Sequence, residues 1–216
     1  MAIQTIELQS PEVQAPGARS VVYKALSSVF RSPGPPCWQQ LESGQLGVAL
    51  AEAAAALPYQ LQVDGELSLG QGLGLQDLEG AYLALFEVGG VDGSPCYLYE
   101  GEHGGGRMAV LDEVLRFYHY FGLRLNEGRR ERPDHVATEL EFMHALAFQE
   151  AAAQASGEDP TPVRKGQRDF LRLHLEPFVT ATASKLAETR EPFYPTLGQW
   201  ASTFCRTDLV YLGDGS

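Results

Sequence analysis

The amino-acid sequence predicts an all-α protein, and three observations lead to this fold class. Apolar side chains recur at spacings of three and four residues in several separate stretches, as on one face of a helix. The strict alternation of apolar and polar residues that is typical of a half-buried strand is almost absent. Segments rich in glycine and proline, which end helices, separate the periodic stretches.

The length of 216 residues suits one large domain or two small subdomains, and 44% hydrophobic residues can supply a core. We predict a single helical domain of two subdomains joined by a hinge. Residues 1–17 are predicted to be a flexible N-terminal segment, and residues 18–122 an N-terminal helical part with a long loop at 88–106. Residues 123–133 are the predicted hinge, and residues 134–211 the C-terminal helical part.

In the N-terminal part, the first helix is predicted at 18–30 and ends at the proline-rich run RSPGPP. An alanine-rich helix follows at 46–57. The next apolar stripe consists of Leu75, Leu78, Tyr82, Leu85 and Phe86. The loop at 88–106 is long for a connection inside a compact domain, and such loops are often functional. The helix at 107–122 closes this part at a glycine.

The C-terminal part opens with the stretch ERPDHVATELEFMHALAFQEAAA, residues 131–153. Its apolar residues Val136, Leu140, Met143 and Ala147 follow the spacing i, i+4, i+7, i+11, which predicts a helix face in the core. Asp134 follows a proline and is predicted to be the N-cap. Further helices are predicted at 162–186, with a kink or break near Pro177, and at 197–206.

The composition excludes several classes of protein. A net charge of −12 and a pI near 4.8 argue against nucleic-acid binding, which needs clustered lysine and arginine. The three cysteines lack the spacing of a zinc site or a disulfide framework. The N-terminus does not resemble a signal peptide, and no apolar run reaches the ~18 residues that span a bilayer. We therefore expect a cytoplasmic protein without membrane insertion.

A metal centre is not predicted, although the stretch at 131–153 contains histidines and carboxylates. Glu141 and His144 form one E-x-x-H pair, whereas a carboxylate-bridged di-iron bundle needs two such pairs. Glu139 and Glu141 lie about 200° apart around a helix and do not converge on one ion. The glycine-rich loops match neither a dinucleotide fingerprint nor a P-loop, and no nucleophile elbow is present. We predict no cofactor, no catalytic residue and no enzymatic activity.

Three segments in a fixed order carry a resemblance to a known family. They are YLALFEV at 82–88, GSPCYLYEGE at 93–102 and ERPDHVATELEFMHAL at 131–146, with a weaker fourth segment, FLRLHLEPF, at 170–178. Together they resemble the TorD/DmsD/NarJ superfamily of redox-enzyme maturation chaperones. The form of the third segment is most similar to the chaperones of type II dimethyl-sulfoxide-reductase-family molybdoenzymes.

The resemblance implies an all-helical cytoplasmic chaperone that is not an enzyme. Its partners would be the apo catalytic subunit of a molybdoenzyme and, as in many family members, the twin-arginine signal peptide of that subunit. The chaperone would hold the subunit until the molybdenum cofactor is inserted, and so delay export. Periodicity leaves open whether the protein is a monomer or a homodimer.

The resemblance also assigns roles to particular residues. Tyr82, Leu85 and Phe86 would form an apolar pocket, and Asp134 and His135 would contact the bound segment at the hinge. The residues of the pocket rim would be Pro95, Tyr97, Tyr99 and Glu100. A twin-arginine segment needs carboxylates beside an apolar surface, because arginine prefers planar carboxylate partners. The carboxylates available for this are Glu100, Glu102, Glu131 and Asp134.

Two alternatives remain open at the level of sequence. One is a protein that binds a nucleotide or another small ligand, or an enzyme, using Glu131, Asp134, His135 and the glycine-rich loops. The other is a scaffold or assembly factor whose helices dock to a partner without a dedicated peptide site. Loss of partner binding on substitution of Asp134 or His135 would favour the chaperone over the scaffold.

Overall fold

The computed structural model describes residues 11–62, 72–88, 93–104, 106–125 and 131–213, and it confirms the all-α prediction. Within these residues no β-strand is present, and an isolated antiparallel bridge pairs Tyr99 with His135. The helical elements in chain order are α1 (Pro11–Val29), α2 (Pro35–Glu42), α3 (Gln45–Ala55), α4 (Leu75–Tyr82), η1 (Leu83–Glu87), η2 (Glu100–Glu102), α5 (Arg107–Tyr120), α6 (Val136–Ser156), α7 (Thr161–Phe170), η3 (Leu171–Leu175), α8 (Glu176–Ala187) and α9 (Tyr194–Gly213).

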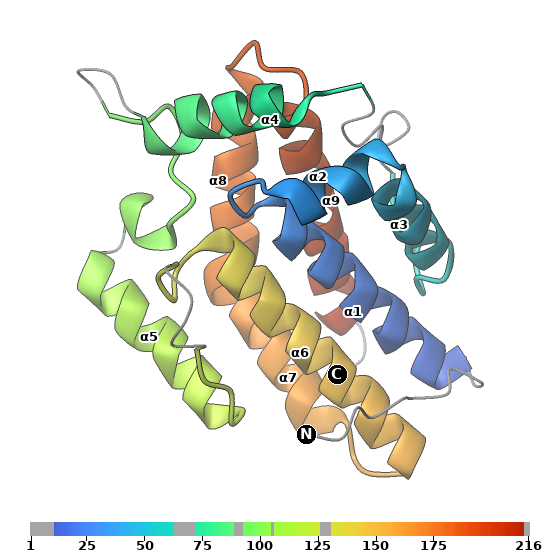
Figure 1. The fold of residues 1–216 in the computed structure, drawn as a ribbon. Coiled ribbons are helices and arrows are strands. Elements are labelled where there is room, and N and C mark those ends of the chain that lie inside the picture. The colour runs from blue at the N-terminus through green and yellow to red at the C-terminus, as the bar shows by residue number, and fades with distance from the viewer. Residues whose placement is uncertain (1–10, 63–71, 89–92, 105, 126–130, 214–216) are drawn as a thin grey trace.

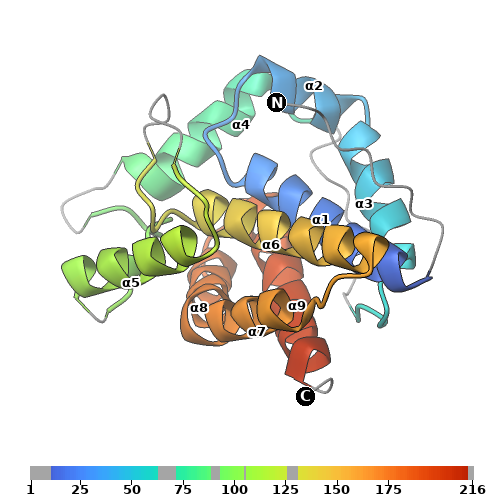
Figure 2. The same cartoon turned by 90° about the horizontal axis from the view of Figure 1, so that it is seen from below.

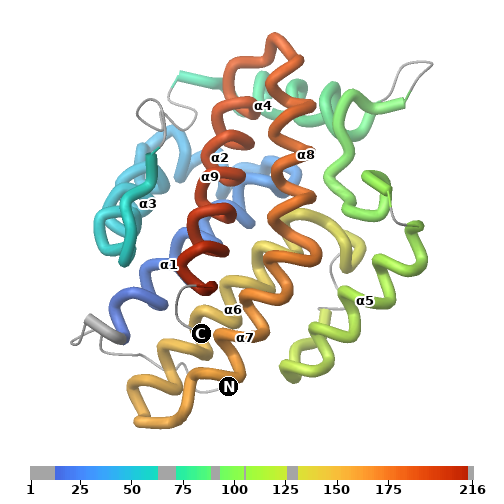
Figure 3. Tube along the Cα trace, turned by 180° about the vertical axis from the view of Figure 1, so that it is seen from behind, coloured from blue at the N-terminus to red at the C-terminus, as the bar shows by residue number. Residues whose placement is uncertain are grey.

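The longer helices form two layers. α1 and α6 lie side by side and run antiparallel in one layer (Figure 1). The other layer contains α7, α8 and α9, and it lies under α1 and α6 in the view from below (Figure 2). From behind, α8 and α9 run next to each other (Figure 3). α2, α3 and α4 cover the opposite side of the α1–α6 layer, and α5 lies at the edge of the molecule (Figure 2).

α6 is the central helix, as its apolar pattern predicts. Val136, Leu140, Met143 and Ala147 are all fully buried. The helix packs against α1 on one side and α7 on the other. The antiparallel register with α1 is fixed by polar contacts, because the Ser27 hydroxyl donates to the carbonyl of Ala137 over 2.8 Å. This packing fixes where the N-terminus of α6 lies.

α7 and α8 form one long helix that is interrupted near Pro177, and this confirms the predicted kink. The interruption is the π-helical segment η3, which ends at Leu175. Pro177 is the second residue of α8, which follows directly. Pro177 has no N–H to donate to the carbonyl of Leu173, and its ring crowds that carbonyl. A widened π-turn accommodates both effects while the chain remains helical.

The boundaries of the first and last helices differ from the prediction. α1 begins at Pro11, so residues 11–17 of the expected flexible segment are helical, and residues 1–10 lie outside the described part. The helix continues through Pro16, and it packs along α6. α9 also extends further than 197–206 in both directions.

The proline-rich run after α1 hides a helix that the sequence did not predict. Pro35 is the first residue of α2, where its missing N–H costs nothing and its fixed φ suits the helix. The Trp38 indole N–H donates to the carbonyl of Leu73 over 3.0 Å, which ties α2 to the segment before α4. The run therefore both ends one helix and starts the next.

The predicted division into two subdomains stays a prediction, because residues 126–130 of the expected hinge lie outside the described part. The predicted loop at 88–106 likewise includes undescribed residues, 89–92 and 105. One cluster of buried apolar side chains includes residues from both predicted parts, from Val22 in α1 to Leu212 in α9. The described residues therefore share one core.

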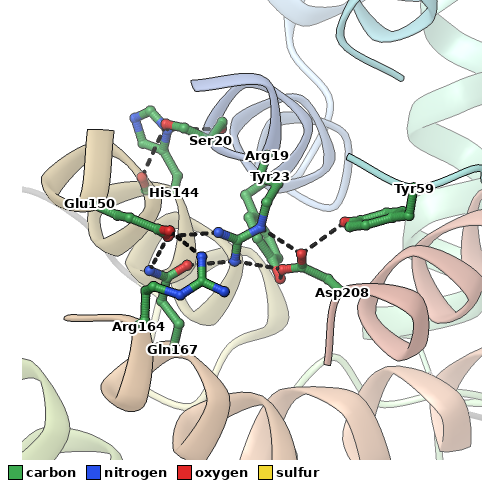
Figure 4. A network of polar contacts seen from close by, with 9 residues as sticks. All are labelled: Arg19, Ser20, Tyr23, Tyr59, His144, Glu150, Arg164, Gln167 and Asp208. Atoms are coloured by element: carbon green, nitrogen blue, oxygen red, sulfur yellow. Dashed lines mark hydrogen bonds and ion pairs between the residues drawn. The ribbon is translucent and has the colours of Figure 1, made fainter. Parts of the chain in front are cut away.

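A network of buried charges joins the two layers (Figure 4). The fully buried guanidinium of Arg19 in α1 donates to both carboxylate oxygens of Asp208 in α9, over 2.5 and 2.9 Å. It also donates to Glu150 in α6 over 2.7 Å and to Gln167 in α7 over 2.6 Å. Arg164 donates to the other oxygen of Glu150 over 2.6 Å. Two guanidiniums therefore balance two carboxylates inside the protein.

We expect Asp208→Ala to lower the free energy of unfolding by about 3–5 kcal/mol, because it leaves the Arg19 guanidinium buried without its main partner. The matched control is Asp112→Ala, which removes an exposed ion pair with Arg116 one turn along α5 and costs less than about 1 kcal/mol. Urea denaturation measures both. A loss for Asp208→Ala no larger than for the control would contradict the structural role of the network.

Candidate functional site

The three sequence segments that suggested a site lie together in the structure. The loop at 93–103 is bonded on one side to η1, where the Cys96 N–H donates to the carbonyl of Leu85 over 3.1 Å. On the other side it pairs with the start of α6, because the Val136 N–H donates to the Leu98 carbonyl and the Glu100 N–H to the Asp134 carbonyl, each over 2.9 Å. We call this place the loop–helix junction. The loop therefore joins η1 to the start of α6.

The apolar residues before the loop belong to the core. Tyr82, Leu85 and Phe86 are between 4% and 6% exposed. The rings of Tyr82 and Phe86 pack on Tyr194 at the start of α9, with ring centroids 5.0 Å apart for Phe86 and 6.2 Å apart for Tyr82. In this conformation Tyr194 fills the space beside them, and their expected role in lining a client pocket stays a prediction.

The rim residues of the loop lie nearer the surface. Pro95 is exposed, while Tyr97, Tyr99 and Glu100 are half-buried. The Tyr97 hydroxyl reaches Gly93, where an added Cβ would lie 2.3 Å from it and where φ is +89°. A glycine is therefore required at that turn. The imidazole of His103 donates to the carbonyl of Tyr97 over 2.8 Å and closes the loop.

Asp134 is fully buried and is not the helix cap that its sequence position suggested. Its carboxylate accepts two hydrogen bonds from the Arg132 guanidinium, each over 2.9 Å, and one from the Gly101 N–H over 3.2 Å. The cap of α6 is His135, whose Nδ1 accepts from the Ala137 N–H over 3.1 Å. Because Arg132 and the Gly101 N–H occupy the Asp134 carboxylate, Asp134 binds the loop and does not cap α6.

The imidazole of His135 is held neutral. It is 3% exposed, and its ring packs edge-on against Tyr99 with centroids 5.0 Å apart. Burial lowers the pKa of His135 from 6.5 to about 4, although the neighbouring Glu131 acts to raise it. A neutral ring is also what the cap needs, because only an unprotonated Nδ1 accepts a hydrogen bond.

Arg132 occupies the most polar part of the junction. Beyond its bidentate pair with Asp134, its guanidinium lies 3.3 and 3.4 Å from one oxygen of Glu102. Its central carbon lies 4.1 Å from the centroid of the Tyr99 ring, within range of a cation–π interaction. Nearby, Arg31 lies 3.5 Å from Glu131. Sequence reasoning singled out the carboxylates here but missed the arginine that joins them.

A buried carboxyl group, that of Glu139, lies behind the loop, and the sequence did not predict its contact with Glu100. Glu139 in α6 is fully buried, and no hydrogen-bond donor reaches its two oxygens. Burial, then the neighbouring carboxyl group of Glu100, raises the pKa of Glu139 well above its ordinary value. Two carboxyl groups bond to each other only by sharing a proton, so we infer that Glu139 is protonated and donates to Glu100.

Glu100 also connects the loop to the second π-helical segment. The Nδ1 atom of His174 in η3 lies 3.1 and 3.2 Å from its two carboxylate oxygens, and His174 is almost fully buried. The loop is therefore bordered by a π-turn on both sides, η1 through Cys96 and η3 through Glu100. Such turns occur often at functional sites.

Two cavities open away from the junction. One, of about 570 Å³, lies between α5 and α7 and is lined by aromatic rings and by Arg116, Lys165 and Asp169. The other, of about 630 Å³, lies between the end of α3 and Trp200.

Among the described residues, no group of three or more histidine, cysteine, aspartate or glutamate side chains is arranged to hold a metal ion. None of the described helices is both long and apolar enough to cross a membrane.

Comparison with known proteins identifies the family. Residues 43–184 match the model of the nitrate reductase delta subunit family. The chain belongs to this family. The matched range includes all three segments of the junction, and the resemblance to redox-enzyme maturation chaperones is confirmed.

Two curated relatives match nearly the whole chain. The chlorate reductase assembly chaperone protein of Ideonella dechloratans is 35% identical over 88% of this chain and 90% of its own length. The selenate reductase assembly chaperone protein of Thauera selenatis is 35% identical over 89% of this chain and 88% of its own. A crystal structure of a redox enzyme maturation protein from Archaeoglobus fulgidus shares the fold, with a TM-score of 0.51 and 19% identity over 90% of this chain and 93% of its own.

The neutral His135 predicts a specific pH dependence. Because its pKa is about 4 in the folded protein and 6.5 in the reference state, its contribution to stability is present above about pH 6.5 and is lost as the pH falls through 4. His135→Asn keeps a capping oxygen but does not titrate. We expect wild type to lose roughly 3 kcal/mol more than this variant between neutral and acidic pH in urea denaturation. Parallel losses would contradict the prediction.

The protonated Glu139 predicts a contribution to stability that changes with pH in the opposite direction to that of His135. A raised pKa means that its contribution to stability is present below 4.5 and is lost as the pH rises toward the folded-state value. Glu139→Gln keeps the shape and a donor for Glu100, so we expect it to be at least as stable as wild type at neutral pH. The control is Glu141→Gln, which weakens the ion pairs with Lys24 and Arg31. Thermal melting that shows Glu139→Gln to be the less stable of the two would contradict the shared proton.

Proposed function

We propose that this protein is a cytoplasmic assembly chaperone for a molybdoenzyme. It binds the apo catalytic subunit, engages the twin-arginine signal peptide of that subunit, and holds it while the molybdenum cofactor is inserted. It acts by stoichiometric binding and performs no turnover, so export of an empty enzyme is delayed. The substrate of this action is a protein segment, and no cofactor is bound by the chaperone itself.

The observation that carries the proposal is the extent of the match to the two assembly chaperones. Each relative aligns over nearly 90% of both chains, so the comparison concerns whole proteins and not a shared fragment. The described fold is also consistent with a binding role, since the loop–helix junction lies beside the shared helical core, between α5 and the start of α6 (Figure 1).

The chemistry of the junction suits a segment that carries arginines beside apolar residues. The side chains of Glu102 and Glu131 are 34% and 27% exposed there. Burial raises the pKa of Tyr82, and the charges of Glu87 and then Glu131 add to the rise, so Glu87 and Glu131 lie near Tyr82. Leu83 and Val88 of the same region are exposed apolar side chains. Carboxylates and apolar surface are therefore available together.

The residues divide into two groups by what a client would touch. Pro95, Tyr97, Tyr99 and Glu100 would contact it directly from the loop. His135 is buried and caps α6, so it would act by holding the start of α6 in place. Asp134 is buried behind Arg132, so a client would reach its carboxylate only after Arg132 moved. In the apolar wall of Tyr82, Leu85 and Phe86, both rings pack against Tyr194, so a client would reach them after Tyr194 moved.

We expect a tagged copy of the protein, purified from its native cells, to bring with it the immature catalytic subunit of a molybdoenzyme, identified by mass spectrometry. Cells must be grown under conditions in which such an enzyme is made. If none is recovered while the enzyme is being synthesised, the chaperone function is contradicted and a scaffold or ligand-binding function becomes the better account.

The site is tested by charge reversal in the same purification. Glu102→Lys with Glu131→Lys should weaken binding of the subunit by at least about a hundredfold and so abolish its recovery, because each removes a charge-assisted contact worth roughly 1.5–3 kcal/mol. The matched control is Glu113→Lys with Glu158→Lys, which makes the same change in net charge at exposed positions away from the junction. Equal recovery with both double variants, each folded by circular dichroism, would contradict the site.

A further inference from the structure

The guanidinium of Arg132 lies in an arrangement with the chemistry of an arginine-binding site. Asp134 faces it in a planar, bidentate pair, with both hydrogen bonds at 2.9 Å. The ring of Tyr99 covers its face at 4.1 Å, and a second carboxylate, Glu102, lies 3.3 Å from Nη1. A carboxylate fork, an aromatic face and a further acceptor together select a guanidinium over an ammonium ion. We call Tyr99, Glu102 and Asp134 the guanidinium site.

The backbone of these three residues and the carboxylate of Asp134 are held by contacts that do not involve Arg132. Asp134 is fully buried and also accepts from the Gly101 N–H over 3.2 Å. The backbone of Tyr99 is fixed by its bridge to His135, and that of Glu102 by its N–H, which donates to the Tyr99 carbonyl over 3.1 Å. The position of the Asp134 carboxylate therefore does not depend on which guanidinium occupies the site.

Gly101 lets the loop backbone approach the carboxylate. An added Cβ there would lie 3.1 Å from Oδ2 of Asp134 and 3.0 Å from Cα of Arg107. Both contacts are tighter than ordinary van der Waals distance, so a larger residue would push the loop away from Asp134. The close approach gives the carboxylate a backbone donor and leaves its remaining acceptor positions for a guanidinium.

The occupant is less firmly held than the site. The side chain of Arg132 is 24% exposed, whereas that of Asp134 is not exposed at all. Arg132 could thus turn out to solvent, but its departure alone would leave a buried carboxylate without a counter-charge, which is strongly unfavourable. Only another cation of the same geometry replaces it without that cost.

We propose that the guanidinium site is filled by Arg132 in the free protein and by an arginine of the bound client segment in the complex. This inference rests on the proposed function. Arg132 is then an internal competitor that keeps the buried Asp134 paired until a client arrives. Client binding exchanges one guanidinium for another, and the displaced Arg132 moves into solvent. A lysine in the client would not make this exchange, because an ammonium ion cannot form the bidentate pair.

The site is tested without any client by rescue of Arg132→Ala with N-acetyl-arginine amide. We expect the variant to melt below wild type, and its melting temperature to rise by about 3–5 °C when the compound is at about ten times its Kd. Wild type, whose site is filled, should not respond. N-acetyl-lysine amide should rescue neither protein. If Arg132→Ala does not fold, Arg132→Gln, which keeps part of the stem, takes its place.

Arg164→Ala is the matched control. Arg164 is similarly exposed, at 22%, pairs with the buried Glu150 and lies 5.1 Å from the ring of Tyr211. Glu150, however, keeps Arg19 and Gln167 as partners when Arg164 is removed. The arginine compound should therefore rescue Arg132→Ala and not Arg164→Ala. Equal rescue of both, or equal rescue by the lysine compound, would overturn the guanidinium site.

The exchange is tested by calorimetric titration with a synthetic twin-arginine peptide and with its twin-lysine counterpart. Arg132→Ala should bind the arginine peptide about tenfold more tightly than wild type, since the competitor is gone. For the lysine peptide, Arg132→Ala and wild type should have the same affinity. Equal affinity of the two proteins for the arginine peptide would overturn the exchange. Rescue by the arginine compound with no peptide binding by either protein would support the guanidinium site while contradicting signal-peptide binding in the proposed function.

Discussion

The fold depends on satisfying one buried charge, the guanidinium of Arg19. Removing a guanidinium from water is costly, and the cost is offset only if every donor finds a well-placed acceptor. Here the acceptors come from three other helices, Glu150 in α6, Gln167 in α7 and Asp208 in α9 (Figure 4). A shift of any one helix along its axis would break a contact at this centre. The network therefore sets the register of α6, and through it the place where α6 begins.

The second buried ionic cluster, at the start of α6, has a different character. Arg19, Glu150 and Asp208 are closed to solvent, whereas Arg132 is partly exposed and bonded mainly to one carboxylate. Buried polar atoms without a described partner also lie around the loop, on His174 and Thr182. Native cores rarely contain such atoms, so the polar contacts here are less complete than those of Arg19. The molecule thus combines a rigid centre with a junction whose contacts are easier to exchange.

The sequence predicts those helices whose buried residues recur at helical spacing. It does not predict features that depend on contacts between residues far apart in the chain. The apolar face of α6 is readable because each buried position recurs at helical spacing. The start of α2 is not, because Pro35 can equally end one helix or begin another. Asp134 has the residue type of a cap, but a loop N–H and an arginine claim its carboxylate, and His135 caps instead. The contact between Glu100 and His174 joins residues 74 positions apart, and no local pattern signals it.

Hydrogen–deuterium exchange of the protein with and without its purified client subunit tests directly where the client binds. We propose that it binds where the loop at 93–103 meets the start of α6. We expect protection on binding to be concentrated in residues 93–103 and 131–139, whose amides form the junction. Protection confined to the walls of the cavity between α5 and α7, with unchanged exchange at the junction, would contradict it.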